Sequence, residues 1–299
     1  MVWRAAAAIE SGVCSTVICV LGEAFDPMKM AMLMSTASGL ERSYEDPYGP
    51  MGASSGYALV AHRHAFEYGT TDVQRARVAV DQRTNACANP DALFYGKPIT
   101  VDDVLNSRMI ASPLHLLEVV VPCSGAAALV ITSGERAKSL KHPPVYLLGV
   151  GEGESHVGLA YAPTITTSPI KTAAARAFKM AGVTPRDVDM VSAYDCFTIT
   201  VLITLEDAGF CEKGEGGPFC EETDMTYKGK LPVNTHGGQL SFGQAGFAGG
   251  MSHVTEAVRQ LRGETDGRQV PDCEIVYVNG NGGILGDECS IILGTASTL

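Results

Sequence analysis

Apolar and polar positions follow two periods along the first half of the chain, one typical of helices and one of buried strands. Helical spacing predicts helices at residues 2–10, 56–68, 72–88, 99–105 and 134–139. Nearly unbroken runs of β-branched and small apolar residues predict strands at residues 15–22 and 125–132. Runs of this kind are typical of strands buried on both faces, so both strands are expected inside a core.

The second half repeats the alternation. Strands are expected at residues 145–150, 188–193, 275–278 and 290–294, and helices at residues 169–182, 198–208 and 249–261. A glycine-rich turn is expected after residue 150, a polar loop at residues 211–231, and a connection at residues 279–283 between the last two strands. Strands that alternate with helices predict an α/β fold with mostly buried strands.

Composition narrows the class of protein. With 299 residues, 45% of them hydrophobic, the chain is long enough for one large domain or two half-size ones. A net charge of −11 argues against a nucleic-acid partner and against an anionic membrane surface, although a local basic pocket stays compatible with it. Nine scattered cysteines without a C-x-x-C pair indicate a reducing, cytoplasmic setting, with neither a disulfide framework nor a zinc site.

Two segments bear on location and on ligand access. Residues 1–20 are apolar but interrupted by charged residues, so they predict a helix, a turn and a strand, with no signal peptide and no membrane span. Residues 23–55 carry five methionines and three prolines and are interpreted as a loop-rich insertion that covers a ligand or a subunit interface.

The strongest chemical candidate is Tyr194-Asp-Cys-Phe197, which follows a predicted strand and precedes a predicted helix. Helix N-termini offer free N–H donors and a positive dipole, and a cysteine placed there can have a lowered pKa and a raised nucleophilicity. The alternative is a buried structural cysteine beside an ordinary core phenylalanine. The pattern alone leaves both interpretations open.

Two glycine-rich segments, at residues 236–246 and 280–283, are also expected near strand ends. Glycine lets backbone N–H groups approach a ligand closely, so these segments and the Cys196 segment could form an oxyanion hole together. The alternative is that the glycines only make turns. Of the seven histidines, His236 is the candidate acid/base or oxyanion donor, because it directly precedes Gly237 and Gly238.

Taken together, the motifs resemble those of the thiolase superfamily, specifically sterol-carrier-protein-type thiolases and their bacterial lipid-transfer-protein relatives. The motifs are Ile9-Glu-Ser-Gly12, Tyr68-Gly-Thr-Thr71, residues 98–104, residues 124–128, Tyr194-Asp-Cys-Phe197, Asn234-Thr-His-Gly-Gly238, residues 256–263 and residues 280–283. The resemblance implies a five-layer α-β-α-β-α sandwich of two similar halves, usually dimeric. It implies halves at residues 1–144 and 145–299, with a loop insertion at about 23–120 in the first half.

The resemblance also implies roles for individual residues. Cys196 matches the family's acid/base thiol, and Tyr194 stands where these thiolases have a histidine that donates to the acyl oxygen. Gln244 replaces the histidine of a Gly-His-Pro motif, so it can donate a hydrogen bond but cannot act as a base. Asn281 and Gly282 replace a Cys-x-Gly motif and leave a backbone N–H there. With Gly237 and Gly238, these residues are expected to bind a coenzyme A thioester as substrate, without a permanently bound cofactor or a metal.

The first half departs most from the family pattern. The position of the family's nucleophilic cysteine falls before Met1, and the first half is expected to be incomplete at its N-terminus, with an exposed sheet edge. The leading prediction is a thiolase-like acyltransferase that acts on 3-oxoacyl-CoA. Steroid side-chain retro-aldolases share the fold and a Tyr-Asp-x-Phe motif, and they work with a small zinc-ribbon/OB-fold partner. A retro-aldolase that uses Tyr194, and a non-catalytic CoA- or lipid-binding subunit, therefore stay open as alternatives.

Overall fold

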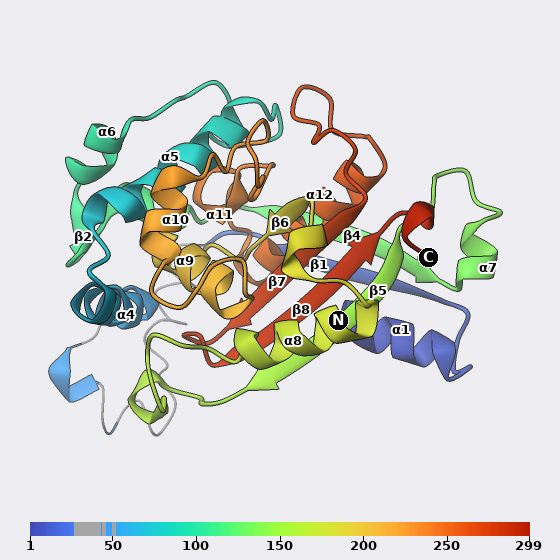
Figure 1. Ribbon diagram of the computed structural model, residues 1–299, viewed down its shortest axis with the longest axis horizontal. Coiled ribbons are helices and arrows are strands. Elements are labelled where there is room, and N and C mark those ends of the chain that lie inside the picture. The colour runs from blue at the N-terminus through green and yellow to red at the C-terminus, as the bar shows by residue number, and fades with distance from the viewer. Residues whose placement is uncertain (27–42, 44–45, 50–51) are drawn as a thin grey trace.

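A computed structural model describes residues 1–26, 43, 46–49 and 52–299. Most of the methionine-rich segment predicted at residues 23–55 lies outside these residues. The largest sheet has four strands in the order β5 (Tyr146–Glu154), β8 (Asp287–Gly294), β7 (Ile275–Gly282) and β6 (Met190–Ser192). Only the β6–β7 pair of this sheet is parallel. In Figure 1 the long β7–β8 hairpin crosses the centre of the molecule.

Helices cover both faces of this sheet. On one face, Phe178 of α8 (Ile170–Ala181) lies in the same core as Ile203 of α9 (Thr198–Asp207), together with Tyr277 and Ile292 from the sheet. On the other face, Ala257 of α12 (Gly249–Leu261) packs with neighbouring sheet positions such as Val276. Successive strand residues point to opposite faces, so both faces of these strands are apolar and buried, as the sequence predicts.

A second, two-stranded sheet lies beyond α12. It consists of β1 (Thr16–Glu23) and β4 (Gly125–Thr132), which pair antiparallel. Met251 of α12, Cys19 of β1 and Ala5 of α1 (Val2–Glu10) lie in one buried hydrophobic cluster. The described residues therefore form four successive layers: α8 and α9, the four-stranded sheet, α12 with α1, and the β1–β4 sheet. This arrangement is consistent with the thiolase-like sandwich that the resemblance implies, with four of its five layers formed by the described residues.

The prediction that β1 and β4 are buried on both faces is wrong. Ile18, Val20 and Val130 are 66%, 57% and 65% exposed, whereas Cys19 is buried against the α12 layer. The side chains alternate between a covered and an open face. A run of β-branched residues indicates a preference for strand conformation, but it does not indicate whether one or both faces of the strand are covered.

The predicted glycine-rich turn after residue 150 is also wrong, because β5 continues through it to Glu154. A Cβ atom on Gly149 would lie 2.1 Å from the carbonyl oxygen of Ala177, and one on Gly151 would lie 1.9 Å from that of Ala173. Both oxygens belong to α8. These glycines therefore allow α8 to lie directly on the backbone of β5, and the alternate spacing of the glycines marks one face of a strand.

Most of the remaining elements surround one end of the sandwich. They are α4 (Ala53–Tyr68), α5 (Asp72–Cys87), α6 (Val101–Leu105), β2 (Met109–Ala111), β3 (Leu114–His115), α10 (Gly216–Glu222) and α11 (Gly238–Ser241). The short helix α7 (Gly134–Ala137) lies at the opposite end (Figure 1). Short 3-10 helices lie at Asp46–Tyr48, Leu116–Glu118, Leu159–Tyr161, Pro185–Asp187, Gly246–Ala248 and Ala296–Thr298. Two expectations need correction: α10 lies inside the predicted loop at 211–231, and residues 279–282 belong to β7.

Among the residues that the structure describes, no helix combines the length and the apolar character needed to cross a membrane.

Candidate functional site

The site begins at Ala193, the residue that follows β6. Asn234 holds this strand end with both atoms of its amide: Oδ1 accepts from the Ala193 N–H at 2.8 Å, and Nδ2 donates to the Ala193 carbonyl at 2.9 Å. Asn234 has a φ of 53°, a left-handed conformation that asparagine tolerates better than most residues. This double contact fixes the Tyr194–Phe197 segment against the loop that leads to His236.

A segment of the first half, residues 119–123, joins the two motifs that the sequence places far apart. The Val120 N–H donates to the Cys196 carbonyl at 3.0 Å, and the Gln244 N–H donates to the Val121 carbonyl at 2.8 Å. The Cys123 N–H returns a bond of 2.8 Å to the Gln244 carbonyl. Because this segment pairs with Cys196 on one side and with Gln244 on the other, it sets the spacing between them.

Asp195 is the buried anchor of the site. Its carboxylate accepts from the Gln239 N–H at 2.8 Å and from the Leu240 N–H at 3.1 Å, both in α11. His253 Nε2 lies 3.3 Å from the same carboxylate and Nδ1 lies 3.0 Å from the Ser192 hydroxyl. Burial raises the pKa of Asp195, and its hydrogen bond with His253 opposes that rise. The carboxylate therefore acts as a structural clamp on α11.

The Gly237-Gly238 pair serves this clamp. A Cβ atom on Gly238 would lie 2.1 Å from an Asp195 carboxylate oxygen, so no other residue fits there. Gly237 has a φ of 111°, and its N–H donates to the Asn234 carbonyl at 2.8 Å. The Gly237 N–H is therefore already used inside the protein. The predicted contact of these two glycines with a CoA thioester stays a prediction.

Cys196 is 8% exposed, and its thiol hydrogen-bonds with the phenol of Tyr57, which lies in α4. Burial raises the pKa of Cys196 to about 12, and the bond with Tyr57 opposes this rise. The thiol is thus neutral near pH 7, which makes it a proton donor in the resting site. The Asn281 amide donates to the same phenol oxygen at 2.9 Å. Gly282 follows Asn281 at the end of β7, opposite Asp287.

Tyr194 points its phenol toward a pair of glutamine amides. Gln244 Nε2 donates to the Tyr194 oxygen at 3.0 Å, and the Gln239 amide is a second hydrogen-bond partner. Burial raises the pKa of Tyr194 above its usual value, and the nearby Cys196 adds to the rise. Both glutamine contacts act in the opposite direction, because an amide donor stabilises a phenolate. The structure thus brings two of the predicted site residues, Tyr194 and Gln244, into direct contact.

His236 is buried behind this group. Its Nε2 lies 3.2 Å from the Ser252 hydroxyl, and its Nδ1 has no hydrogen-bond partner. Burial lowers the pKa of His236 well below its usual value, so the ring is neutral near pH 7. Its ring centroid lies 5.1 Å from that of His253, which in turn lies 6.0 Å from that of Tyr194. Its predicted role as an acid/base group stays a prediction.

Three groups of the site did not emerge from the sequence: Tyr57, Gln239 and His253. Tyr57 lies in a predicted helix 139 residues before Cys196, and nothing in its local pattern separates it from a core tyrosine. No motif in the sequence separates His253 from the other histidines, yet it is fully buried against Asp195. The helical spacing of residues 249–261 places His253 on the same face as Val254 and Ala257, and this position is the one feature of the sequence that indicates burial of His253.

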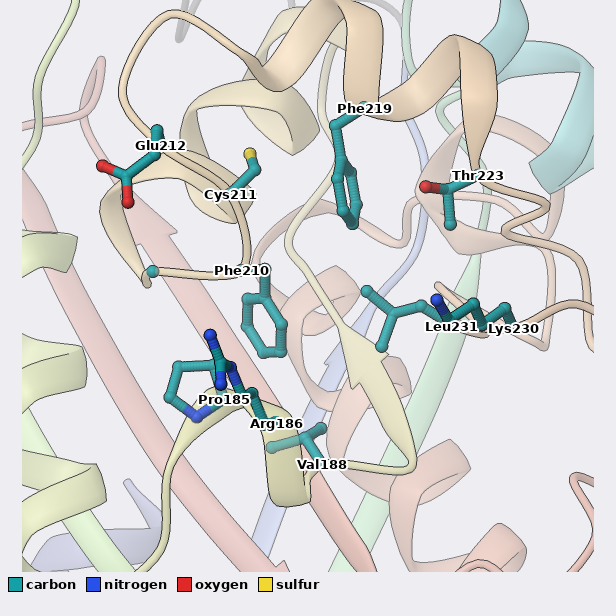
Figure 2. Close-up of a pocket in the computed structure, with 11 residues that line it drawn as sticks. Pro185, Arg186, Val188, Phe210, Cys211, Glu212, Phe219, Thr223, Lys230 and Leu231 are labelled. Carbon is teal, nitrogen blue, oxygen red and sulfur yellow. The ribbon is translucent and has the colours of Figure 1, made fainter.

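A separate surface hollow of about 480 Å³ lies away from these residues. Figure 2 shows the rings of Phe210 and Phe219 among its lining residues, which also include Arg186 and Lys230. Its thiol, Cys211, has a pKa raised by burial to about 12 and is therefore not a reactive nucleophile. None of the predicted site residues lines this hollow. Within the described parts of the chain, no group of three or more His, Cys, Asp or Glu side chains is arranged to hold a metal ion.

Comparison with known proteins decides the family. Residues 151–295 match the family model described as Thiolase C-terminal domain-like. A steroid side-chain-cleaving aldolase of Thermomonospora curvata is 36% identical, and the match covers 95% of this chain and 74% of that protein. The chain belongs to the thiolase superfamily. Within it, the relatives place the chain among the sterol-carrier-protein-type members.

Two further relatives extend the comparison. An acetyl-CoA acetyltransferase of Methanothermobacter thermautotrophicus is 41% identical over 76% of this chain, and the match spans only 59% of that relative's length. A solved structure titled "Ltp2-ChsH2(DUF35) aldolase" superposes on the whole chain with a TM-score of 0.89 and 34% identity, and 77% of that chain is covered. The relatives thus include proteins named for acyl transfer and proteins named for carbon–carbon cleavage.

Proposed function

We propose that this chain cleaves the bond between the α- and β-carbons of a β-hydroxyacyl-CoA thioester by a retro-aldol reaction. The observation that carries the proposal is the Tyr194 phenol oxygen, on which the amides of Gln244 and Gln239 converge. Amide donors on the phenol oxygen oppose the burial that holds the pKa of Tyr194 above its usual value, and the small phenolate fraction is a base for the β-hydroxyl proton. Cys196 lies two residues further along the same strand end as a neutral thiol.

The proposed step balances protons and electrons. The Tyr194 phenolate takes the β-hydroxyl proton, and the β-oxygen becomes the carbonyl of the leaving ketone or aldehyde. The electrons of the broken Cα–Cβ bond pass to the thioester as an enolate, and the Cys196 thiol protonates its α-carbon. The products are a carbonyl compound and a shortened acyl-CoA. Proton exchange with water then returns the Tyr194 phenolate and the Cys196 thiol.

The relatives support this assignment. The two proteins named for side-chain cleavage, an aldolase and a 17-hydroxy-3-oxo-4-pregnene-20-carboxyl-CoA lyase, match 95% of this chain at 36% identity. The acetyltransferase is more similar per residue but is matched over a smaller share of both chains. A substrate with a tertiary β-hydroxyl group, which releases a ketone, is the class that we infer from these names.

Two variants test the roles separately. The chain is incubated with 3-hydroxy-3-methylbutyryl-CoA and bulkier tertiary β-hydroxyacyl-CoA thioesters, and the ketone and acyl-CoA products are measured. The Tyr194→Phe variant should lose cleavage while it still exchanges the α-protons of the product acyl-CoA in D₂O, because this exchange needs only Cys196. The Cys196→Ala variant should lose the exchange. Unchanged cleavage in Tyr194→Phe would refute the proposal.

The second candidate is the thiolase-like acyltransferase reaction on a 3-oxoacyl-CoA. The hydrogen-bonded Cys196–Tyr57 pair favours it, because a stabilised thiolate at this position can remove an α-proton for a Claisen condensation. Incubation with a 3-oxoacyl-CoA and free coenzyme A distinguishes the two reactions. CoA-dependent cleavage that survives in Tyr194→Phe would favour the acyltransferase, and no turnover of either thioester would favour a non-catalytic, CoA-binding subunit.

We also propose that the chain forms a homodimer that associates with a small zinc-ribbon/OB-fold partner. The support is the solved aldolase whose title joins Ltp2 to ChsH2(DUF35). Light scattering on the purified chain should give twice the 31.5 kDa mass of one chain. Co-expression with a candidate partner should add that partner's mass and raise the turnover number. A monomer that turns over at the same rate with and without the partner would contradict this part.

A further inference from the structure

Tyr57 reaches the site through a close contact between α4 and the β7–β8 turn. The residue before it, Gly56, faces Ile284 so closely that a Cβ atom would lie 2.3 Å from the Ile284 Cδ1 atom. The ring of Tyr57 stacks on Phe197 with centroids 4.5 Å apart and planes at 28°. Tyr57 is 1% exposed. Both contacts hold the phenol next to the residue that follows Cys196.

The phenol oxygen of Tyr57 has three polar neighbours. The Asn281 amide donates to it at 2.9 Å, the phenol O–H lies 3.2 Å from the Gly283 carbonyl, and the Cys196 thiol is its third partner. A phenol has a single proton, so it donates either to the Gly283 carbonyl or to sulfur. A separation of 3.2 Å is long for an O–H···O bond, so the bond to Gly283 is weak and readily exchanged.

The charge state of Cys196 decides which acceptor takes that proton. While Cys196 is a neutral thiol, its own S–H can donate to the Tyr57 oxygen, and the phenol proton remains with Gly283. Once Cys196 gives up its proton, the thiolate is a much stronger acceptor than a peptide carbonyl, because hydrogen bonds to charged groups are about twice as strong as neutral ones. The Asn281 amide polarises the phenol further, because it donates to the same oxygen.

The geometry points to Tyr57 as the residue that stabilises the Cys196 thiolate, by turning its phenol proton from the Gly283 carbonyl to the sulfur each time Cys196 loses its proton. Tyr57 acts on the reacting sulfur atom and not on the substrate oxygen, which separates its role from that of Tyr194. The catalytic consequence rests on the function proposed above. The effect on thiol ionisation is a property of the free protein and stands without that function.

The electrostatic surroundings explain why Cys196 needs such a donor. Burial dominates the rise in the pKa of Cys196, and the negative charges of Asp195 and Glu288 add to it. The Tyr57 bond is the largest effect that opposes this rise. The pKa of Tyr57 is itself raised far above its usual value by burial, so its phenol keeps its proton and remains a donor when Cys196 ionises.

Thiol alkylation tests the inference without any substrate. The intact chain is treated with iodoacetamide at pH 8 to 9, and modification of Cys196 is followed by mass spectrometry of its peptide. Because only the thiolate reacts, the rate reports the ionised fraction. Tyr57→Phe keeps the ring and its stacking on Phe197 but removes the donor. The rate should fall by about 10- to 100-fold, the effect of a lost hydrogen bond to a charged group.

Tyr277→Phe is the matched control. Tyr277 is a fully buried tyrosine that stacks on Phe178 and hydrogen-bonds with the Ser290 hydroxyl, so this variant removes an equivalent phenol elsewhere in the core. Its Cys196 alkylation rate should stay within about twofold of the parent chain, a change far below the loss of a hydrogen bond to a charged group. Asn281→Ala keeps the Tyr57 donor but removes its polarising partner, so it should give a smaller fall in the same direction, and it serves as the decisive variant if Tyr57→Phe fails to fold.

The outcomes separate the inference from the proposed function. A folded Tyr57→Phe chain with an unchanged alkylation rate, or an unchanged rate in Asn281→Ala when Tyr57→Phe does not fold, overturns the inference even if the parent chain cleaves CoA thioesters. A fall in the rate together with no turnover of any thioester supports the inference and refutes the function. Where turnover exists, α-proton exchange in Tyr57→Phe should fall in parallel with alkylation and shift to higher pH.

Discussion

Tyr194 and Cys196 are two residues apart, and burial and neighbouring negative charge raise the pKa of both. The opposing hydrogen bonds come from different partners: the Gln244 amide at the Tyr194 oxygen and the Tyr57 phenol at the Cys196 sulfur. Since the pKa of Tyr194 is raised, only a small fraction is phenolate at neutral pH, and that fraction grows tenfold for each pH unit. We therefore expect kcat/KM for cleavage to rise about tenfold per pH unit from pH 7 to pH 9.

This pH dependence is measured with the parent chain and with Cys196→Ser. The parent should show a slope of one in a plot of log kcat/KM against pH. The serine variant should be slower at every pH but keep the slope, because Tyr194 is unchanged. A flat profile in the parent chain would show that phenolate formation does not limit the reaction.

Asp195 allows a second prediction at this scale. Its carboxylate accepts from two backbone N–H groups and from His253, so Asp195→Asn would bring an amide donor against an existing donor. We expect the variant to lose about 1 to 3 kcal/mol of stability and most of its cleavage activity. Asp189→Asn is the control, because Asp189 Oδ2 also accepts from two backbone N–H groups, of Glu274 and Ile275, at the other end of β6.

Urea unfolding and product assays check both aspartate variants. Asp189→Asn should lose stability and keep its activity per folded molecule, whereas Asp195→Asn should lose both. If Asp195→Asn kept full activity per folded molecule, Asp195 would be an anchor for α11 without influence on Tyr194.

The residues of the site differ in how far the sequence reveals them. Cys196 and Tyr194 lie in one short motif at a strand end, so a local pattern is sufficient to find them. The Gln244 contact depends on residues 119–123, which pair with both motifs from the other half of the chain. Tyr57 can be recognised as a site residue only in the folded structure, in which α4 packs against the β7–β8 turn. Contacts that depend on docking between distant segments leave no periodic signal in the sequence.

At the scale of single elements, the glycines of β5 govern how closely α8 can approach. A Cβ atom on Gly151 would lie 1.9 Å from the Ala173 carbonyl oxygen, which is a backbone atom and cannot move aside alone. We expect Gly151→Ala to destabilise the protein by about 1 to 3 kcal/mol, the range for overpacking a dense core. The matched variant, Gly280→Ala, places its Cβ in open space on β7 and should change stability much less.

Chemical denaturation of both glycine variants measures this difference. Equal stabilities of Gly151→Ala and Gly280→Ala would mean that α8 is free to move outward. The comparison also explains why the turn predicted after residue 150 is wrong. Glycines at alternate positions occur in turns, and they also occur on the face of a strand that a helix approaches closely.

Helix and strand positions were otherwise well predicted where the periodicity is strong. The helices α1 and α12 begin and end at the residues that the pattern gives. The sequence missed α10, which has only seven residues and begins with Gly216 and Gly217. Helices this short derive their stability mainly from tertiary contacts, so their own sequence says little about them.

At the scale of the whole molecule, the exposure of a strand's side chains depends on which layers cover the strand. The sequence of the strand alone does not show this. β1 and β5 both contain apolar runs, yet β5 lies between α8 and the layer of α1 and α12, whereas β1 is covered only on the side of that layer. The order of the four described layers follows from which helices lie between the two sheets (Figure 1). The family resemblance supplied that order, and periodicity alone predicted only an α/β protein.

Asp81 connects the two halves of the chain and makes stability depend on pH. It lies in α5, is 2% exposed, accepts from the Met225 N–H at 3.3 Å and pairs with Arg77 at 3.0 Å. Burial raises the pKa of Asp81 to about 6, despite the opposing charge of Arg77. The unfolded carboxyl has a pKa of about 3.9, so the folded protein holds this proton more tightly. The contribution of Asp81 to stability therefore falls as the pH rises from about 4 to about 6.

Replacement by asparagine removes this titration. Asp81→Asn keeps an acceptor for the Met225 N–H and has no charge to bury, so at pH 7 it should be more stable than the parent chain, by up to about 2 kcal/mol. Near pH 4 the advantage should vanish, since the parent carboxyl is then protonated in the folded state. Urea unfolding at both pH values measures this, with Asp91→Asn as the control, because the Asp91 side chain is 65% exposed. A stability difference that is the same at pH 4 and pH 7 would show that the Arg77 pair keeps Asp81 ionised throughout, and that the two halves meet at a charged contact.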